Sequence, residues 1–195
     1  MNRRTFIKSS SLATAAVASG FHTPLFAQNN KLRIGLIGSG WYGMVIAKAA
    51  LEAGGVEVIA VADVDNQHLS NSLNELASLQ GSRPRGFSDY RELLEISGLE
   101  AVLIGSVTHW HALQFIASCR KGLPVYCEKP LTHTLAEARQ LREEARKAGV
   151  ATQLGNQGQS SEGSRLLCEY LAAGAIGPVR EVHCWSDRPT HSGKP

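Results

Sequence analysis

IGLIGSGWYGMVIAKAA, residues 34–50, is the most informative stretch of this chain for its fold. An apolar run of strand length leads into Gly38, Gly40 and Gly43, which form the pattern GxGxxG, and a segment of helical periodicity follows. A second apolar run, VEVIAVAD, ends at Asp63, 25 residues after Gly38. The glycine pattern alone is weak evidence, but between a strand and a helix it is typical of a dinucleotide-binding unit.

Strands and helices are expected to alternate on both sides of this stretch. Apolar runs of strand length lie at residues 32–38, 56–63, 100–106, 123–128 and 150–155. Segments of helical periodicity lie at residues 41–54, 67–80, 87–97, 109–122 and 132–149. Strands that are apolar on both faces and alternate with helices form a parallel sheet covered on both sides. The sequence therefore predicts an α/β fold, a Rossmann-type doubly wound parallel sheet.

Three helix starts carry recognisable capping residues. Ser88 precedes the short helix of FSDYRELLEIS and is expected to cap it. Thr134 and Glu137 have the spacing of a capping box. Asp65 precedes NQHLSN, and we interpret it as a helix cap.

The pattern changes after Gly158. A helix is expected at residues 161–174 and a strand in VREVHCWS, residues 179–186, shortly before the last residue. We predict an NAD(P)-binding Rossmann domain at residues 31–158 and the start of a truncated α+β substrate domain at residues 159–195.

The first thirty residues are typical of an export signal. NRRTFIK places Arg3 and Arg4 before a short, weakly apolar stretch, and Ala27 offers a small residue for cleavage. This is the twin-arginine pattern, so we predict a signal peptide at residues 1–30, recognition by the twin-arginine translocase, and a periplasmic or secreted protein. The alternative is an ordinary amphipathic helix.

The charge distribution argues against a nucleic-acid partner. The net charge is +3, and Arg3, Arg4 and Lys8 account for it, because the charges of residues 31–195 cancel. No basic face with interleaved aromatic residues is present, so nucleic-acid binding is not expected.

The glycine-rich turn predicts how a dinucleotide would bind. Glycines permit the tight turn and a close approach of the backbone to the pyrophosphate, and the following helix offers free N–H groups to it. The predicted contacts are Gly38, Ser39, Gly40, Trp41, Tyr42 and Gly43. Asp63 would accept hydrogen bonds from the adenosine ribose and repel a 2′-phosphate, which favours NAD over NADP. Asp65 is the weaker candidate for that role.

Polar groups follow three later strands of the predicted sheet. They begin at Ser106 in GSVTHWH, at Glu128 in EKP and at Gly155 in GNQGQ. Ligands of open parallel sheets bind beyond the carboxyl ends of the strands, so these groups are expected to surround one pocket.

Four segments together resemble one protein family. VYCEKPLT, the GxGxxG turn, AVADVD and GAIGPVREVH are similar to the glucose–fructose oxidoreductase / inositol dehydrogenase (Gfo/Idh/MocA) family over residues 32 to about 187. GNQGQSSEGSRLLCE and CWSDRP most resemble its exported bacterial branch. The chain departs from the family at Val107-Thr108, where a proline–acid turn is usual.

The resemblance implies roles for the EKP segment. Lys129 would be the catalytic acid–base that holds the substrate hydroxyl beside the nicotinamide, and burial is expected to lower its pKa. Glu128 would accept from the nicotinamide ribose, and Pro130 would fix the turn, with a cis bond as one option.

The sequence offers other candidate residues, of which His111 follows from the same resemblance. His111 would line the pocket while Trp110 packs. Asn156 and Gln157 would meet the carboxamide or the substrate, or else be turn residues. His109 and His111 form an HxH pattern, but no third ligand has matching spacing, so a metal site is not expected.

The expected function is that of an exported NAD(P)-dependent oxidoreductase that acts on a sugar or polyol by hydride transfer. Because a periplasm offers no pool of free NAD, the cofactor would be tightly bound. The alternatives are an NAD-dependent glycoside hydrolase or epimerase of the same family, and a non-catalytic nucleotide-binding fragment. The full-length protein could form a homo-oligomer.

Replacing both Arg3 and Arg4 by Lys is expected to keep the protein in the cytosol, since the translocase recognises the arginine pair rather than its charge. Cell fractionation measures the effect. Undiminished periplasmic protein from the double variant would contradict the signal-peptide interpretation.

Overall fold

The computed structural model describes residues 31–185. Residues 1–30, with the predicted signal peptide, and residues 186–195 lie outside the described part. The chain divides into two compact units, one up to Leu154 and the other from Gly155 onward. The domain boundary predicted after residue 158 stays a prediction.

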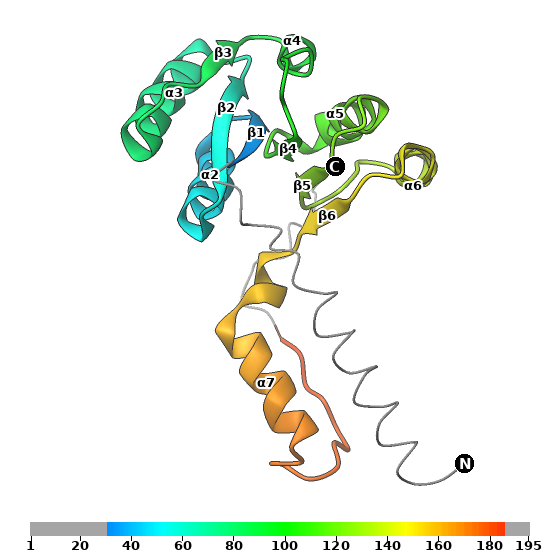
Figure 1. The fold of residues 1–195 in the computed structure, drawn as a ribbon. Coiled ribbons are helices and arrows are strands. Elements are labelled where there is room, and N and C mark those ends of the chain that lie inside the picture. The colour runs from blue at the N-terminus through cyan, green and yellow to red at the C-terminus, as the bar shows by residue number, and fades with distance from the viewer. Residues whose placement is uncertain (1–30, 186–195) are drawn as a thin grey trace, which may run out of the picture. The chain divides into compact units, whose positions relative to one another are not determined.

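The first unit is built on a six-stranded sheet (Figure 1). Its strands are β1 (Leu32–Ile37), β2 (Val56–Ala62), β3 (Arg85–Phe87), β4 (Ala101–Ile104), β5 (Val125–Glu128) and β6 (Thr152–Gly155). Their spatial order is β3-β2-β1-β4-β5-β6, and the strands pair in parallel. The order reverses between β1 and β4, which makes that edge the expected ligand crevice. This confirms the predicted doubly wound fold, although β3 was not expected.

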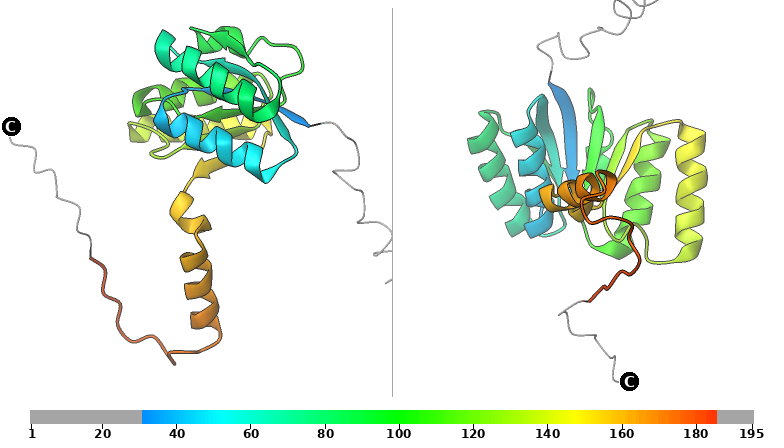
Figure 2. Two further views of the ribbon diagram at one scale, coloured as in Figure 1. Left: turned by 90° about the vertical axis from the view of Figure 1, so that its left-hand side faces the viewer. Right: turned by 90° about the horizontal axis from the view of Figure 1, so that it is seen from below.

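Helices cover both faces of the sheet, as the right-hand view of Figure 2 shows. They are α2 (Trp41–Ala53), α3 (Asn66–Gln80), α4 (Tyr90–Leu93), α5 (Thr108–Arg120) and α6 (Leu135–Ala148). On one face α2 and α3 pack on Leu36, Val58 and Val61. On the other, α4, α5 and α6 enclose a larger core around Ile104 and Val125. Both faces of the central strands are therefore buried, which explains their continuous apolar runs.

Local side chains determine where several helices begin. Thr134 and Glu137 form the predicted capping box of α6, and Asp65 caps α3 by accepting from the backbone N–H groups of two residues. The predicted cap of α4 was wrong: Asp89 rather than Ser88 caps it. The Asp89 carboxylate accepts from Arg91 N at 2.8 Å, and a carboxylate is a strong acceptor for a helix N–H.

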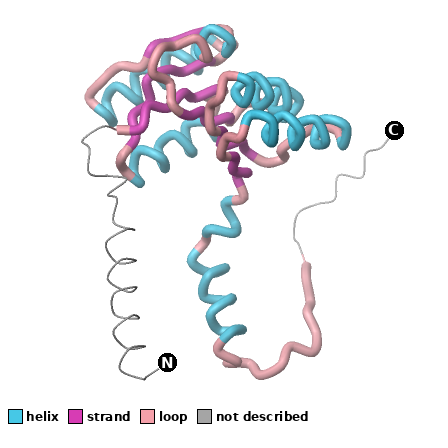
Figure 3. Tube along the Cα trace, turned by 45° about the vertical axis from the view of Figure 1, so that its right-hand side comes forward, coloured by secondary structure: helices cyan, strands magenta, loops and turns pink. Residues whose placement is uncertain are grey.

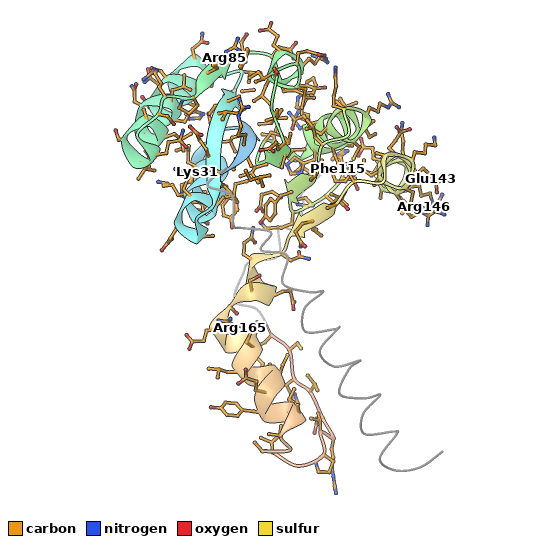
Figure 4. All side chains as sticks on the ribbon, in the orientation of Figure 1. Lys31, Arg85, Phe115, Glu143, Arg146 and Arg165 are labelled. Carbon is orange, nitrogen blue, oxygen red and sulfur yellow. The ribbon has the colours of Figure 1, made fainter. Side chains whose placement is uncertain are left out.

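The polar side of α6 faces away from the sheet. Glu143 and Arg146 extend outward from this helix in Figure 4, whereas Leu141 is buried beneath it. This arrangement is the ordinary amphipathic pattern of a surface helix.

The second unit contains a 3₁₀ turn, Gln157–Ser160, and helix α7 (Glu162–Ala172) (Figure 3). Ser161 caps α7 through Ser164 N. The strand predicted at residues 179–186 is absent from its described part, residues 179–185. A strand needs a neighbour to satisfy its backbone groups, and residues 179–185 belong to no sheet of the described chain. No helix among the described residues is long and apolar enough to cross a membrane.

Candidate functional site

A cavity of about 540 Å³ lies at the carboxyl ends of β1, β2 and β4. It is lined by Ile37, Gly38, Gly40, Trp41, Tyr42, Ala62, Asp63, Val64, Asp65, His68, Ser88, Asp89, Tyr90, Arg91, Gly105, Ser106, Val107, Trp110 and Gln114. This is the crevice where the strand order reverses, and its volume suits a cofactor or small ligand.

Two glycines of the turn are required by the protein itself. Gly38 has φ +84°, and a Cβ there would lie 2.5 Å from backbone atoms of Ser106. A Cβ on Gly43 would overlap the carbonyl oxygen of Gly38. These glycines bring β1, the start of α2 and the end of β4 into close contact, which positions the loop at the cavity.

Gly40 is different, because no protein contact requires it to be glycine. Its φ of −62° is open to any residue, and a Cβ there would have no protein atom within 4 Å. Gly40 instead lines the cavity. A missing side chain that faces open space at a ligand crevice fits the close approach of a pyrophosphate.

The N-terminus of α2 is suited to an anion. Gly40 is its N-cap, no side chain caps it, and no acidic residue lies in its first turn. The first N–H groups of a helix have no intrahelical acceptors and carry partial positive charge. Trp41 and Tyr42 of that first turn line the cavity. The helix start can therefore bind a phosphate group.

Asp63 is held at the end of β2 by three donors. Its Oδ2 accepts from Ser39 N at 2.6 Å and from Ser39 Oγ at 3.0 Å, and its Oδ1 accepts from Asp65 N at 2.9 Å. Ser39 itself is buried, and it does not line the main cavity. Ser39 therefore fixes the Asp63 carboxylate beside the glycine turn, and its direct contact with a cofactor stays a prediction.

The end of β5 carries a buried carboxylate. Glu128 is 4% exposed, and its Oε1 accepts from the Tyr126 hydroxyl at 3.0 Å while Oε2 accepts from Lys129 N at 3.2 Å. Burial, and secondly this hydrogen bond, raise the pKa of Tyr126 to about 12, so its hydroxyl remains a donor. The Lys129–Pro130 peptide bond is cis, one of the two options expected.

The expectation of a buried Lys129 was wrong. Its side chain is exposed, and within the described residues its ammonium group makes no hydrogen bond or ion pair. Neither Glu128 nor Lys129 lines the cavity.

The positions expected for His111 and Trp110 were wrong, because Trp110 lines the cavity and His111 does not. His111 is 1% exposed, and its ring nitrogens lie 2.8 Å from Pro130 O and 2.9 Å from Ser106 O. It therefore ties the loops after β4 and β5 together instead of lining the cavity. Trp110 lines the cavity and makes an edge contact with Tyr90, with ring centroids 6.4 Å apart.

The remaining predicted residues divide between the two units. Gly38, Gly40, Trp41, Tyr42, Asp63 and Ser106 line one cavity, whereas Asn156 and Gln157 belong to the second unit. Ser106 Oγ donates to Gln114 Oε1 at 2.5 Å. No group of three potential metal ligands occurs among residues 31–185.

Sequence reasoning missed one wall of the cavity. Asp89, Tyr90 and Arg91 follow the short strand β3 and line the same cavity as the glycine turn. The backbone N–H of Arg91, and secondarily its guanidinium, hold the pKa of Asp89 below its ordinary value. The sequence signal for this wall is the helix cap in FSDYREL, which lies at Asp89 and not at the predicted Ser88.

The comparisons with known proteins agree with this geometry. A family model described as "Oxidoreductase family, NAD-binding Rossmann fold" (Gfo/Idh/MocA) matches residues 32–156. The chain belongs to this family. Its Rossmann unit is accordingly an NAD-binding fold, and the open cradle at Gly40, the uncapped start of α2 and the Asp63 carboxylate fit that cofactor.

Individual relatives share the same region. The chain is 30% identical to the rhizopine catabolism protein MocA of Rhizobium meliloti over 82% of its own length and 49% of that protein. It is 32% identical to a glycosyl hydrolase family 109 protein of Stenotrophomonas maltophilia over 66% of its length and 29% of that protein. The inositol 2-dehydrogenase of Azotobacter vinelandii is 29% identical over 78% of this chain and 45% of its own. The chain thus spans less than half the length of these curated relatives.

A solved structure has the same fold. The probable dehydrogenase from Thermotoga maritima superposes with a TM-score of 0.67 at 32% identity, covering 75% of this chain and 42% of that one.

Gly43→Ala is expected to affect mainly the stability of the fold, and Gly40→Ala mainly NAD binding. The first should destabilise the fold by roughly 1–3 kcal/mol, because its Cβ overlaps Gly38 O. The second should cost less than about 1 kcal/mol of stability but weaken NAD binding about tenfold, because its Cβ enters the cavity. Thermal unfolding and calorimetric titration measure the two effects. A Gly40→Ala variant that binds NAD normally would contradict the proposed path of the pyrophosphate.

Proposed function

We propose that the protein is an NAD-dependent oxidoreductase that transfers hydride from a sugar or polyol. One observation carries the proposal: the open cradle at Gly40 and the fixed Asp63 carboxylate face the same cavity. Relatives named inositol 2-dehydrogenase and MocA support a polyol-like substrate. Titration with NAD, followed by a screen of sugars and polyols for NADH formation at 340 nm, roughly the absorbance maximum of reduced nicotinamide, tests it.

Each end of the cofactor has a partner in this proposal. The Asp63 carboxylate accepts from the adenosine ribose, and its charge disfavours a 2′-phosphate there. The first N–H groups of α2 bind the pyrophosphate. Glu128, held by Tyr126, accepts from the nicotinamide ribose. Bound NAD supplies the hydride acceptor.

Lys129 is the proposed acid–base group. It follows β5 directly, on a turn fixed by Pro130, and its ammonium is not engaged by other described residues. In its neutral amine form Lys129 can therefore accept the proton of a substrate hydroxyl as that hydroxyl is oxidised, and the ammonium that results can donate to the carbonyl oxygen that forms.

A second candidate is an NAD-dependent glycoside hydrolase or epimerase. The relative of the glycosyl hydrolase family 109 supports it, whereas the retained EKP sequence favours the oxidoreductase. The two differ in outcome: a dehydrogenase accumulates NADH, while transient oxidation returns the hydride and leaves NAD unchanged as the substrate is cleaved or inverted. A chain that binds NAD and converts no substrate would support the non-catalytic alternative.

Export through the twin-arginine pathway remains part of the proposal. A protein exported in the folded state would carry its cofactor with it, which favours tight binding. The arginine pair of the first thirty residues supports this location.

Asp63→Ala is expected to weaken NAD binding by roughly 1.5–3 kcal/mol, because a hydrogen-bonded carboxylate is lost. It should also relax discrimination against NADP, since a negative charge is removed. Calorimetric titration with both dinucleotides measures both effects. Unchanged NAD affinity would rule out the ribose contact.

Lys129→Ala in the full-length protein is expected to reduce turnover by about 10²- to 10⁴-fold while NAD stays bound. The cofactor is retained because the pyrophosphate and adenosine supply most of its affinity. The rate constant and the bound NAD are measured on one preparation. Normal turnover with bound NAD would show that Lys129 has no part in the chemistry.

A further inference from the structure

The charges around the cavity are unevenly distributed. Three carboxylates line it, those of Asp63, Asp65 and Asp89. Among the described residues that line it, Arg91 is the only lysine or arginine. The affinity for a ligand with an additional phosphate group therefore depends strongly on whether this guanidinium is available to bind it.

Arg91 is held by its neighbours. Its Nη1 lies 3.0 Å from Asp89 Oδ2 and 3.2 Å from Oδ1, and its guanidinium carbon lies 4.8 Å from the centre of the Tyr90 ring. Asp89 Oδ1 also accepts from Arg91 N at 2.8 Å. The carboxylate thus engages one edge of the guanidinium, through Nη1, and partly offsets its charge.

The sheet register places this pair beside the proposed ribose site. Asp63 N donates to Phe87 O at 3.1 Å, so β2 and β3 end side by side. Asp89 follows Phe87 by two residues, and Asp63 directly follows β2. A ribose bound by Asp63 would therefore present its 2′ position near both groups of the ion pair.

We propose that the Asp89–Arg91 pair is a second determinant of selectivity for NAD over NADP, an inference that rests on the proposed binding of NAD in this cavity. A guanidinium is the side chain best matched to a phosphate. Here Asp89 competes for it and adds its own repulsion toward a 2′-phosphate. Selectivity then depends on two carboxylates, of which Asp63 acts by contact and Asp89 by partly neutralising Arg91.

Asp89→Asn tests the proposal without removing the helix cap. Asparagine keeps an oxygen that can accept from Arg91 N but loses the negative charge, so α4 should stay capped. The pair is exposed, with 62% and 41% of the two side chains accessible, so its screened interaction limits the effect. At low salt we expect the ratio of NADP to NAD affinity to rise about five- to tenfold, with NAD affinity changed less than about twofold.

Two further variants separate release of Arg91 from a general loss of negative charge. Asp65→Asn removes another carboxylate that lines the cavity and caps a helix, but one without an arginine partner, so it should raise the ratio less than Asp89→Asn. The double variant Asp89→Asn/Arg91→Gln should not show the increased ratio of NADP to NAD affinity, because the guanidinium is gone. All variants keep His68, which also lines the cavity, but because Asp65 interacts with it electrostatically, its contribution cancels only among the wild type and the variants that retain Asp65.

The outcomes distinguish this inference from the function on which it rests. Calorimetric titration of the 195-residue chain with NAD⁺ and NADP⁺ gives both affinities. A wild-type chain that binds neither dinucleotide contradicts the proposed function. A chain that binds NAD, but whose affinity ratio is unchanged in Asp89→Asn, or changes equally in Asp65→Asn, overturns the role of the pair alone.

Discussion

The contact between Gly43 and the Gly38 carbonyl is the constraint on which the cavity depends. With no side chain at either position, the first turn of α2 packs against the end of β1, and Gly105 of the neighbouring strand end also lies close to Gly43. This contact directs the uncapped start of α2 at the crevice between β1 and β4. The phosphate-binding capacity of the site is thus a consequence of backbone packing more than of any single side chain.

A second set of contacts adjoins this helix start. Ser39 fixes the Asp63 carboxylate from within the glycine turn, which holds the proposed ribose acceptor close to the proposed pyrophosphate donors. In the same cavity Asp89 pairs with Arg91, the only lysine or arginine among the described residues that line it. At the end of β5, the Tyr126 hydroxyl and the Lys129 backbone N–H orient a buried Glu128.

The sequence could predict those features that interactions between residues close in sequence determine. The glycine spacing, the apolar runs and the caps at Asp65 and Thr134 act within a few residues of themselves, and the structure agrees with each. His111 could not be placed this way, because it bridges loops that follow two different strands. Strand β3 was missed because three residues, RGF, give no periodicity, and with it the wall from Asp89 to Arg91 was missed.

The account is tested most directly by a crystal structure of the chain with NAD⁺. It predicts pyrophosphate oxygens at hydrogen-bond distance, about 2.7–3.2 Å, from backbone N–H groups in the first turn of α2, with the adenosine ribose hydroxyls on Asp63. Dinucleotide density away from the crevice between β1 and β4, or a ribose that makes no contact with Asp63, would contradict it.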